Sequence, residues 1–104
     1  MTDRLEKLRN MLADDPADQM LRYMLAMELD KTGDSDQSLD MLTSLMNDDA
    51  PHVPAFLMAG QQLARLGRVD EANSTYLRGI EEAQRQGNDH AAAEMSQFRA
   101  ELGL

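Results

Sequence analysis

The segment 30–36, Asp-Lys-Thr-Gly-Asp-Ser-Asp, is the part of the sequence richest in possible metal ligands. Calcium-binding helix-loop-helix sites need oxygen ligands at alternate positions, a central glycine and a closing bidentate glutamate. Whether the count starts at Asp30 or at Asp34, the two decisive positions hold unsuitable residues: Ser35 and Met41, or Leu39 and Leu45. We therefore predict no metal site here and interpret Asp34 and Asp36 as turn and helix-capping residues.

The residue types that usually carry catalysis are few and scattered. The sequence has no cysteine and two histidines, His52 and His90, which we expect at the surface near the start of two helices. It contains no glycine-rich phosphate loop, and no two histidines are spaced four residues apart as a zinc site requires. We interpret Glu81-Glu82 as solvated charge. We therefore predict a protein that is not an enzyme and that has no cofactor.

The overall composition narrows the class of partner. The chain has 104 residues, of which 10 are lysine or arginine and 19 are aspartate or glutamate, so its formal net charge is −9. A binder of nucleic acid or of an anionic membrane surface would carry the opposite sign. We see no signal peptide and no membrane span in the sequence. Together with the absence of cysteine, this predicts a cytoplasmic protein.

Apolar residues recur every three or four positions, as on one face of a helix. Three such stripes are Leu5, Leu8, Met11 and Leu12; Leu39, Leu42, Leu45 and Met46; and Tyr76, Leu77, Ile80 and Ala83. No stretch alternates β-branched and polar residues. We therefore predict an all-α chain with helices over 2–14, 18–32, 36–48, 52–66, 70–86 and 89–102. Short connections imply that successive helices pack antiparallel.

Residues that stop and start helices stand at regular places. Gly33 and Gly67 each follow a helical pattern, and a glycine at positive φ is a common helix end. Ser35 and Asp36 are expected to cap the helix after Gly33, and Asp70 the helix after Gly67. Pro16 and Pro51 each follow an acidic pair, where a helix has just ended.

The chain repeats itself with a period equal to the separation of Gly33 and Gly67. In this register Leu5 aligns with Leu39, and Asp14-Asp15 aligns with Asp48-Asp49. Further aligned pairs are Leu8 with Leu42, Met11 with Leu45, Leu12 with Met46, Met24 with Met58, Ala26 with Gly60, Leu29 with Leu63 and Leu42 with Tyr76. A unit of about 34 residues that holds two helices is typical of stacked helical repeats.

These units resemble the tetratricopeptide repeat family. In the first helix the family has an apolar residue followed by a small one, and Leu25-Ala26 and Ala59-Gly60 meet this pattern. In the second helix the family has a small residue, a large one and then a small or apolar one, and this pattern is met by Ser38, Leu42 and Leu45 and by Ala72, Tyr76 and Gly79. The family's aromatic residue near the start of the unit is present as Phe56, whereas Arg22 stands at the equivalent position of the first unit. The closing proline is displaced by one residue to Pro51 in the first unit and is missing from the second.

The resemblance covers nearly the whole chain and implies one domain over 1–104. It divides into a partial repeat helix (1–16), a first repeat (19–52), a second repeat (53–86) and a capping helix (89–104). The implied fold is a right-handed α-solenoid of helix pairs. The capping helix would turn Ala91, Met95, Phe98 and Leu102 inward.

The resemblance also implies a function, because the first helices of the family line a concave surface that binds a peptide or a partner helix. Here that groove would be lined by Met20, Tyr23, Met27, Asp30 and Lys31 from the first unit, and by Pro54, Leu57, Gln61, Ala64 and Arg65 from the second. One branch of the family grips a terminal carboxylate with lysine and asparagine. Those side chains are not present at the matching positions, so we expect no capture of a terminal carboxylate. The partner we expect is an amphipathic helix or an extended apolar segment.

Two other functions stay open at the level of sequence. Two copies could bury the same groove in a homo-oligomer, which would make it a subunit interface. The excess of acids, concentrated in the first half, could instead hold a metal or a basic ligand, although charges that cap helices and maintain solubility are the simpler interpretation. Of the 9 methionines, we expect Met11, Met41, Met46 and Met95 in the core, and either groove or core for Met20 and Met27.

Overall fold

The computed structural model describes residues 3–104 and contains six helices and no strand in that range. They are α1 (Asp3–Asp14), α2 (Gln19–Lys31), α3 (Ser35–Met46), α4 (Val53–Arg65), α5 (Val69–Arg85) and α6 (Asp89–Ala100). The all-α prediction is confirmed, and each predicted helix is found within two residues of its expected ends. Residue 2, the expected start of the first helix, lies outside the described residues. None of the helices in 3–104 is long and apolar enough to cross a membrane.

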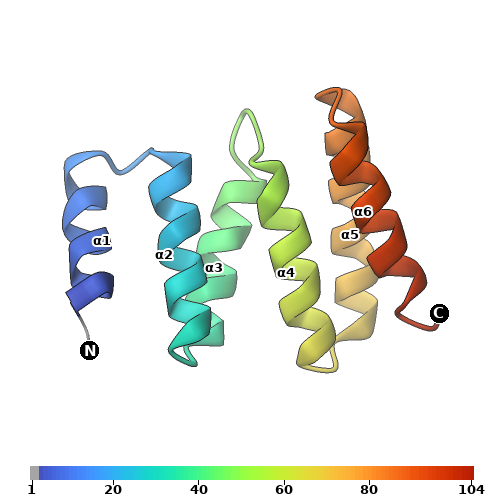
Figure 1. Ribbon diagram of the computed structural model, residues 1–104, viewed down its shortest axis with the longest axis horizontal. Helices are drawn as coiled ribbons and strands as arrows, with labels where there is room; N and C mark the ends of the chain where they lie inside the picture. The colour runs from blue at the N-terminus through green and yellow to red at the C-terminus, as the bar shows by residue number, and fades with distance from the viewer. Residues whose placement is uncertain (1–2) are drawn as a thin grey trace.

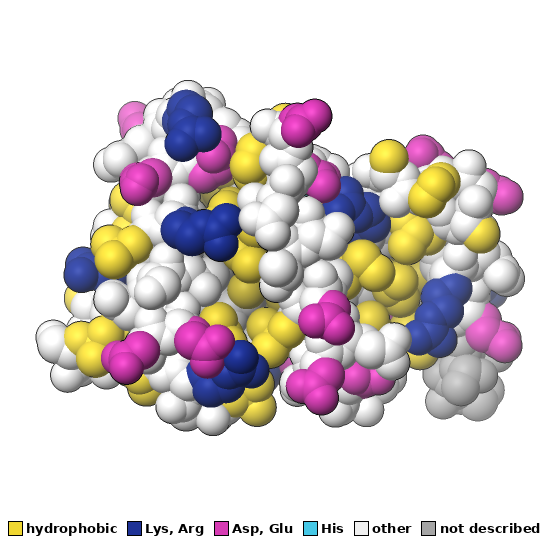
Figure 2. Space-filling view, turned by 180° about the vertical axis from the view of Figure 1, so that it is seen from behind, with side chains coloured by type: hydrophobic (Ala, Val, Ile, Leu, Met, Phe, Trp, Pro, Cys, Tyr) yellow, Lys and Arg dark blue, Asp and Glu magenta, His cyan; other side chains and the backbone are white. Residues whose placement is uncertain are grey.

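Successive helices run antiparallel and form a stack along the longest axis of the molecule (Figure 1). Helices α2, α4 and α6 lie toward the viewer in Figure 1, with α3 and α5 behind them. We call the surface formed by α2, α4 and α6 the front face, and the opposite surface, seen in Figure 2, the back face. Each of the two complete units therefore contributes one helix to each face.

The helix ends follow the expected glycines, but two caps differ from the prediction. Gly33 and Gly67 have φ of 90° and 79°, which only glycine adopts at little cost. The N-cap of α3 is Asp34, whose side chain accepts a hydrogen bond from the amide of Gln37; this agrees with the interpretation of Asp34 as a turn or capping residue, but Ser35 and Asp36 do not cap the helix. Arg68 stands at the cap of α5 without a side-chain cap bond, and Asp70 lies in its first turn, where its charge favours the helix N-terminus.

The core runs through the stack between the two layers of helices. Its largest fully buried side chains include Tyr76, Phe56, Leu42, Leu45 and Met95, which come from α3, α4, α5 and α6. A smaller cluster of Leu8, Leu25 and Leu29 joins α1 to α2. Met95 is fully buried, and Ala91, Phe98 and Leu102 pack against the core, so α6 covers the end of the second unit as expected.

The smallest residues mark the closest approaches between helices. A Cβ atom on Gly60 would lie too close to the Tyr76 ring, only 2.6 Å from Cζ, and one on Gly79 would lie 2.5 Å from Cβ of Phe56. Both distances are far below van der Waals contact, so α4 and α5 meet at this depth only because these two residues are glycines. In the first unit the residue equivalent to Gly60 is Ala26, and its partner across the interface is the smaller Leu42 in place of Tyr76.

Four expectations about burial are wrong. Met11 and Leu77 are 52% and 42% exposed, because each lies at the edge of its apolar stripe, which the neighbouring helix does not cover. Glu82 is buried and accepts hydrogen bonds from Arg85 and Gln86, although its neighbour Glu81 is exposed. His52 is not a surface residue but is half-buried beneath Tyr23.

Candidate functional site

The front face carries the residues that the resemblance assigned to a groove. On α2, Met20 and Met27 are 57% and 46% exposed, and Lys31 is also exposed. On α4, Leu57 is half-buried, whereas Gln61 and Arg65 are exposed. Helix α4 lies between α2 and α6 (Figure 1), so the front face has two seams, one between α2 and α4 and one between α4 and α6.

The first seam, between α2 and α4, is filled by the protein's own side chains. The ring of Tyr23 lies edge-on to that of His52, with centroids 5.0 Å apart. Further along, Nη2 of Arg65 donates to both carboxylate oxygens of Asp30, at 2.9 and 3.1 Å. The predicted groove residues of this seam are thereby divided: Tyr23, Asp30 and Arg65 make contacts within the molecule, while Met27 projects to solvent.

The second seam, between α4 and α6, contains two hollows. The Leu57 hollow has a volume of about 140 Å³ and is lined by Val53, Pro54, Leu57, Asn88, Ala91, Glu94 and Met95. The Ala64 hollow has a volume of about 250 Å³ and is lined by Gln61, Ala64, Tyr76, Phe98, Glu101 and Leu102. Four residues predicted for the groove on α4 therefore line these hollows, but their opposite wall is α6, which the sequence interpretation treated only as a cap.

Negative charge borders both hollows of the second seam. Glu94 belongs to the Leu57 hollow and Glu101 to the Ala64 hollow, and neither forms an ion pair within residues 3–104. Burial, and secondly the charge of Glu94, raises the pKa of Tyr23 above its usual value. Burial and the charge of Glu101 likewise raise the pKa of Tyr76. Glu94 therefore influences Tyr23, which lies on α2 beyond α4, and Glu101 influences Tyr76 on the adjacent α5.

A polar cluster lies behind the first seam, and the sequence interpretation missed it. Arg22 is 7% exposed and donates to Asp48 at 2.6 and 3.0 Å, and also to the hydroxyl of Ser44. Nε2 of Gln19 donates to the same carboxylate at 2.9 Å. The hydrogen bonds from Arg22 and Gln19 hold the pKa of Asp48 below its usual range. The sequence offers two signs of this cluster. Arg22 stands where the family has an aromatic residue, and the acidic residue Asp48 lies shortly before the second unit.

His52 lies against this cluster. Burial, and secondly the positive charge of Arg22, lowers the pKa of His52 below 6.5, while Asp48 opposes that shift. Its Nε2 atom is buried and has no hydrogen-bond partner among the described residues. The lowered pKa favours the neutral imidazole, whose ring packs against Tyr23.

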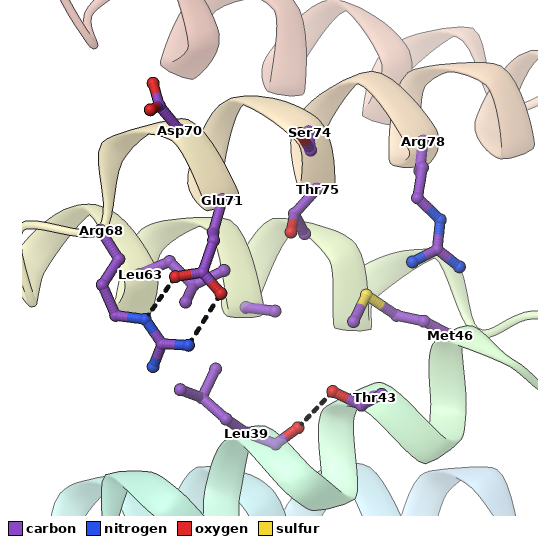
Figure 3. A pocket seen from close by; sticks show the side chains of 11 residues that line it. Leu39, Thr43, Met46, Leu63, Arg68, Asp70, Glu71, Ser74, Thr75 and Arg78 are labelled. Carbon is purple, nitrogen blue, oxygen red and sulfur yellow. Dashed lines mark hydrogen bonds and ion pairs between the residues drawn. The ribbon is translucent and has the colours of Figure 1, made fainter.

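Two larger hollows lie on the back face, where Figure 2 shows apolar side chains at the surface. One hollow of about 380 Å³ lies between α3 and α5 over α4; in Figure 3, Arg68 and Glu71 pair at one end of it and Arg78 lies at the other. A second, of about 410 Å³, lies between α1 and α3. In the register of the repeat, each residue lining the second hollow aligns with a residue lining the first. Such recurrence indicates a consequence of helix stacking rather than a specialised site.

The acidic residues form no metal centre in the part of the chain that the structure describes. Within residues 3–104, no cluster of three or more histidine, aspartate or glutamate side chains has a geometry that could hold an ion. In the segment 30–36, Asp30 pairs with Arg65, and both carboxylate oxygens of Asp34 accept hydrogen bonds from Gln37. Asp30 thus joins α2 to α4, and Asp34 caps α3.

Comparison with known proteins places the fold in a family. No family model matches the sequence, and no curated protein matches it. Among solved structures, the solution NMR structure of a tetratricopeptide repeat domain protein from Salinibacter ruber is similar, with a TM-score of 0.79 and 31% identity over 85% of this chain and 89% of that one. A crystal structure of a tetratricopeptide repeat domain protein from Salinibacter ruber has a TM-score of 0.75 and 29% identity over 83% of this chain and 97% of that one. The chain therefore belongs to the tetratricopeptide repeat family.

Proposed function

We propose that this protein is a non-catalytic scaffold that binds a segment of another protein on its front face. The residues proposed to contact the partner are those that the resemblance to the family assigns to the groove: Met20, Tyr23, Met27, Lys31, Leu57, Gln61 and Arg65. The family's fold is that of a protein-interaction scaffold, which supports the general class of function. The specific surface is argued from the residues themselves.

The observation that carries the proposal is the combination of exposed apolar side chains and hollows on one face. Met20 and Met27 expose about half of their surface along one side of α2, and the second seam offers two hollows with apolar floors. A flexible thioether adapts to different partner surfaces, and anchoring side chains of a peptide need pockets of this kind. No comparable row of exposed large apolar residues occurs on another face of the described chain.

A selection experiment tests the proposal. Peptides are selected from a random 12-residue display library on the wild-type protein, and their affinities are measured by fluorescence anisotropy. We expect Met27→Glu and Leu57→Glu to weaken binding at least about tenfold, because each places a charge on the apolar surface. Leu77→Glu is the matched control, since Leu77 is exposed on α5. If every selected peptide binds the two front-face variants as well as the wild type, the binding surface lies elsewhere and the proposal is wrong.

The alternative use of the same surface is self-association. Sedimentation velocity at several concentrations distinguishes the two uses, because a dimer that dissociates in Leu57→Glu would make the front face a subunit interface. A monomer at all concentrations leaves the face open to a different protein.

A further inference from the structure

The two seams of the front face occupy equivalent places in successive units but are built differently. Helices α2, α4 and α6 are each followed, a few residues after their last turn, by a glycine, Gly33, Gly67 or Gly103, and all three glycines have positive φ. The second pair of glycines is slightly further apart than the first, because α5 is longer than α3. Positions on the three helices therefore correspond when they stand equally far before their helix-ending glycine.

At one end of the seams, an aromatic pair is replaced by a hollow. The first seam holds Tyr23 against His52. The equivalent residues of the second seam are Leu57 and Asn88, which are smaller and border the hollow of about 140 Å³. The space that the protein fills with its own side chains in the first seam is open in the second.

At the other end, an ion pair is replaced by an unpaired acid. The first seam holds Asp30 and Arg65 in an ion pair. The equivalent residues of the second seam are Ala64 and Glu101, and both line the hollow of about 250 Å³. Arg65 pairs with Asp30 in the first seam, whereas Glu101, at the position equivalent to Arg65, has Ala64 opposite it and no ion-pair partner within residues 3–104. No lysine, arginine or histidine lines either hollow.

We propose that the second seam binds a cationic segment of a partner protein, which places an aliphatic side chain in the Leu57 hollow and a lysine or arginine against Glu101. The proposal rests on the proposed function and adds to it the chemistry and position of the partner. It also places the main contacts with the partner between α4 and α6, whereas the residues named under the proposed function lie on α2 and α4.

Charge and size favour this occupant over others. Glu94 lies on α6, and Glu101 follows directly after the last residue of that helix, two turns further along, which places the two residues about 10 Å apart along the helix axis. A segment with two basic residues at that spacing would meet both carboxylates while its apolar residue enters the hollow between Leu57 and Ala91. Each hollow is smaller than the roughly 300–1,000 Å³ of pockets that bind small molecules. A side chain of a polypeptide fits them better than a free ligand.

The second seam can be closed by copying the first. In Leu57→Tyr, the new ring occupies the Leu57 hollow as Tyr23 occupies the space beside His52. In the double variant Ala64→Asp/Glu101→Arg, a new ion pair covers the Ala64 hollow as Asp30 and Arg65 cover the first seam. Neither change introduces an unpaired charge into apolar surface, so both should fold, which circular dichroism and thermal melting verify.

The experiment compares the peptides that different variants select from the random 12-residue library. The wild type should enrich sequences with an aliphatic residue and lysine or arginine. Glu94→Lys/Glu101→Lys should instead enrich acidic sequences and bind wild-type peptides at least about tenfold more weakly. Asp40→Lys/Glu81→Lys makes the same charge change at exposed positions on α3 and α5 and should retain the wild-type preference. The two seam-closing variants should each lower affinity for wild-type peptides about tenfold.

The outcomes separate this proposal from the broader one. Peptides without basic enrichment, or a preference unchanged by Glu94→Lys/Glu101→Lys, would overturn the cationic partner. If such peptides still lose affinity in Met27→Glu, the front face remains a binding surface and only the assignment to the second seam fails. If no selected peptide depends on any front-face residue, both proposals fail.

Discussion

Arg22 donates hydrogen bonds to both carboxylate oxygens of Asp48, at 2.6 and 3.0 Å, and thereby joins the start of α2 to the segment just after α3 within the first unit. In the second unit the position of Arg22 is held by Phe56, over whose ring the guanidinium of Arg78 lies at 5.5 Å. At this position the first unit therefore has the guanidinium of Arg22, and the second unit has the ring of Phe56 with the guanidinium of Arg78 above it.

Removing Arg22 should destabilise the protein. In Arg22→Ala the partly exposed carboxylate of Asp48 loses its cation and the buried site of Arg22 is emptied, and we expect a loss of about 2 kcal/mol in the free energy of unfolding measured with urea. Arg22→Phe should lose less, because a ring fits the equivalent position of the second unit. Arg68→Ala is the control, since its pair with Glu71 is exposed and should matter little. Equal losses for Arg22→Ala and Arg68→Ala would contradict this role.

Stability should fall as the pH drops below about 6.5, with His52 as a cause. The pKa of His52 is lowered in the folded state, so the unfolded chain binds the proton more tightly and unfolding becomes easier between the unfolded and folded pKa values. The groups facing His52 are Tyr23, Arg22 and Asp48. His52→Asn should flatten the pH dependence of the unfolding free energy between about pH 7 and pH 5. An unchanged slope in His52→Asn would refute this assignment.

The lowered pKa of Asp48 predicts a second loss of stability, at lower pH than the first. Its pKa is depressed in the folded state by its bonds to Arg22 and Gln19, so the stabilisation is fully present above the unfolded value near 3.8 and disappears as the pH falls through the folded value. Asp48→Asn should therefore be less stable than wild type at neutral pH but approach it in acid. Acid titration followed by circular dichroism measures the difference, and a constant gap between the two proteins would argue against the ion pair.

The close approach of α4 and α5 predicts a coupling between Gly60 and Tyr76. Gly60→Ala would place a Cβ inside contact distance of the Tyr76 ring and should cost about 1–3 kcal/mol of stability. Gly60→Ala/Tyr76→Leu reproduces the Ala26 and Leu42 pair of the first unit. A double-mutant cycle in urea should show that the double variant is more stable than the sum of its single changes predicts. Simple additivity would mean that the contact is relieved elsewhere.

Local chemistry in the sequence determined the helices, their limits and the repeat. Apolar residues at every third or fourth position specify which face of a helix is buried, and the glycines Gly33 and Gly67 specify where the chain reverses. The six helices and their repeat could therefore be predicted, whereas the groove positions on α4 came from the resemblance to the family and stay a prediction. Met11 and Leu77 were misplaced because a stripe marks a face but not how far the next helix covers it.

Only the tertiary structure decided which equivalent positions are filled and which are open. The pairing of Tyr23 with His52, of Asp30 with Arg65 and of Arg22 with Asp48 joins residues that lie far apart in the chain, and no local pattern specifies such partners. The second seam likewise depends on how α6 packs beside α4. Its hollows exist because Leu57 and Ala64 are too small to reach the facing helix. The distance between two packed helices decides this, and the spacing of residues along one helix does not reveal that distance.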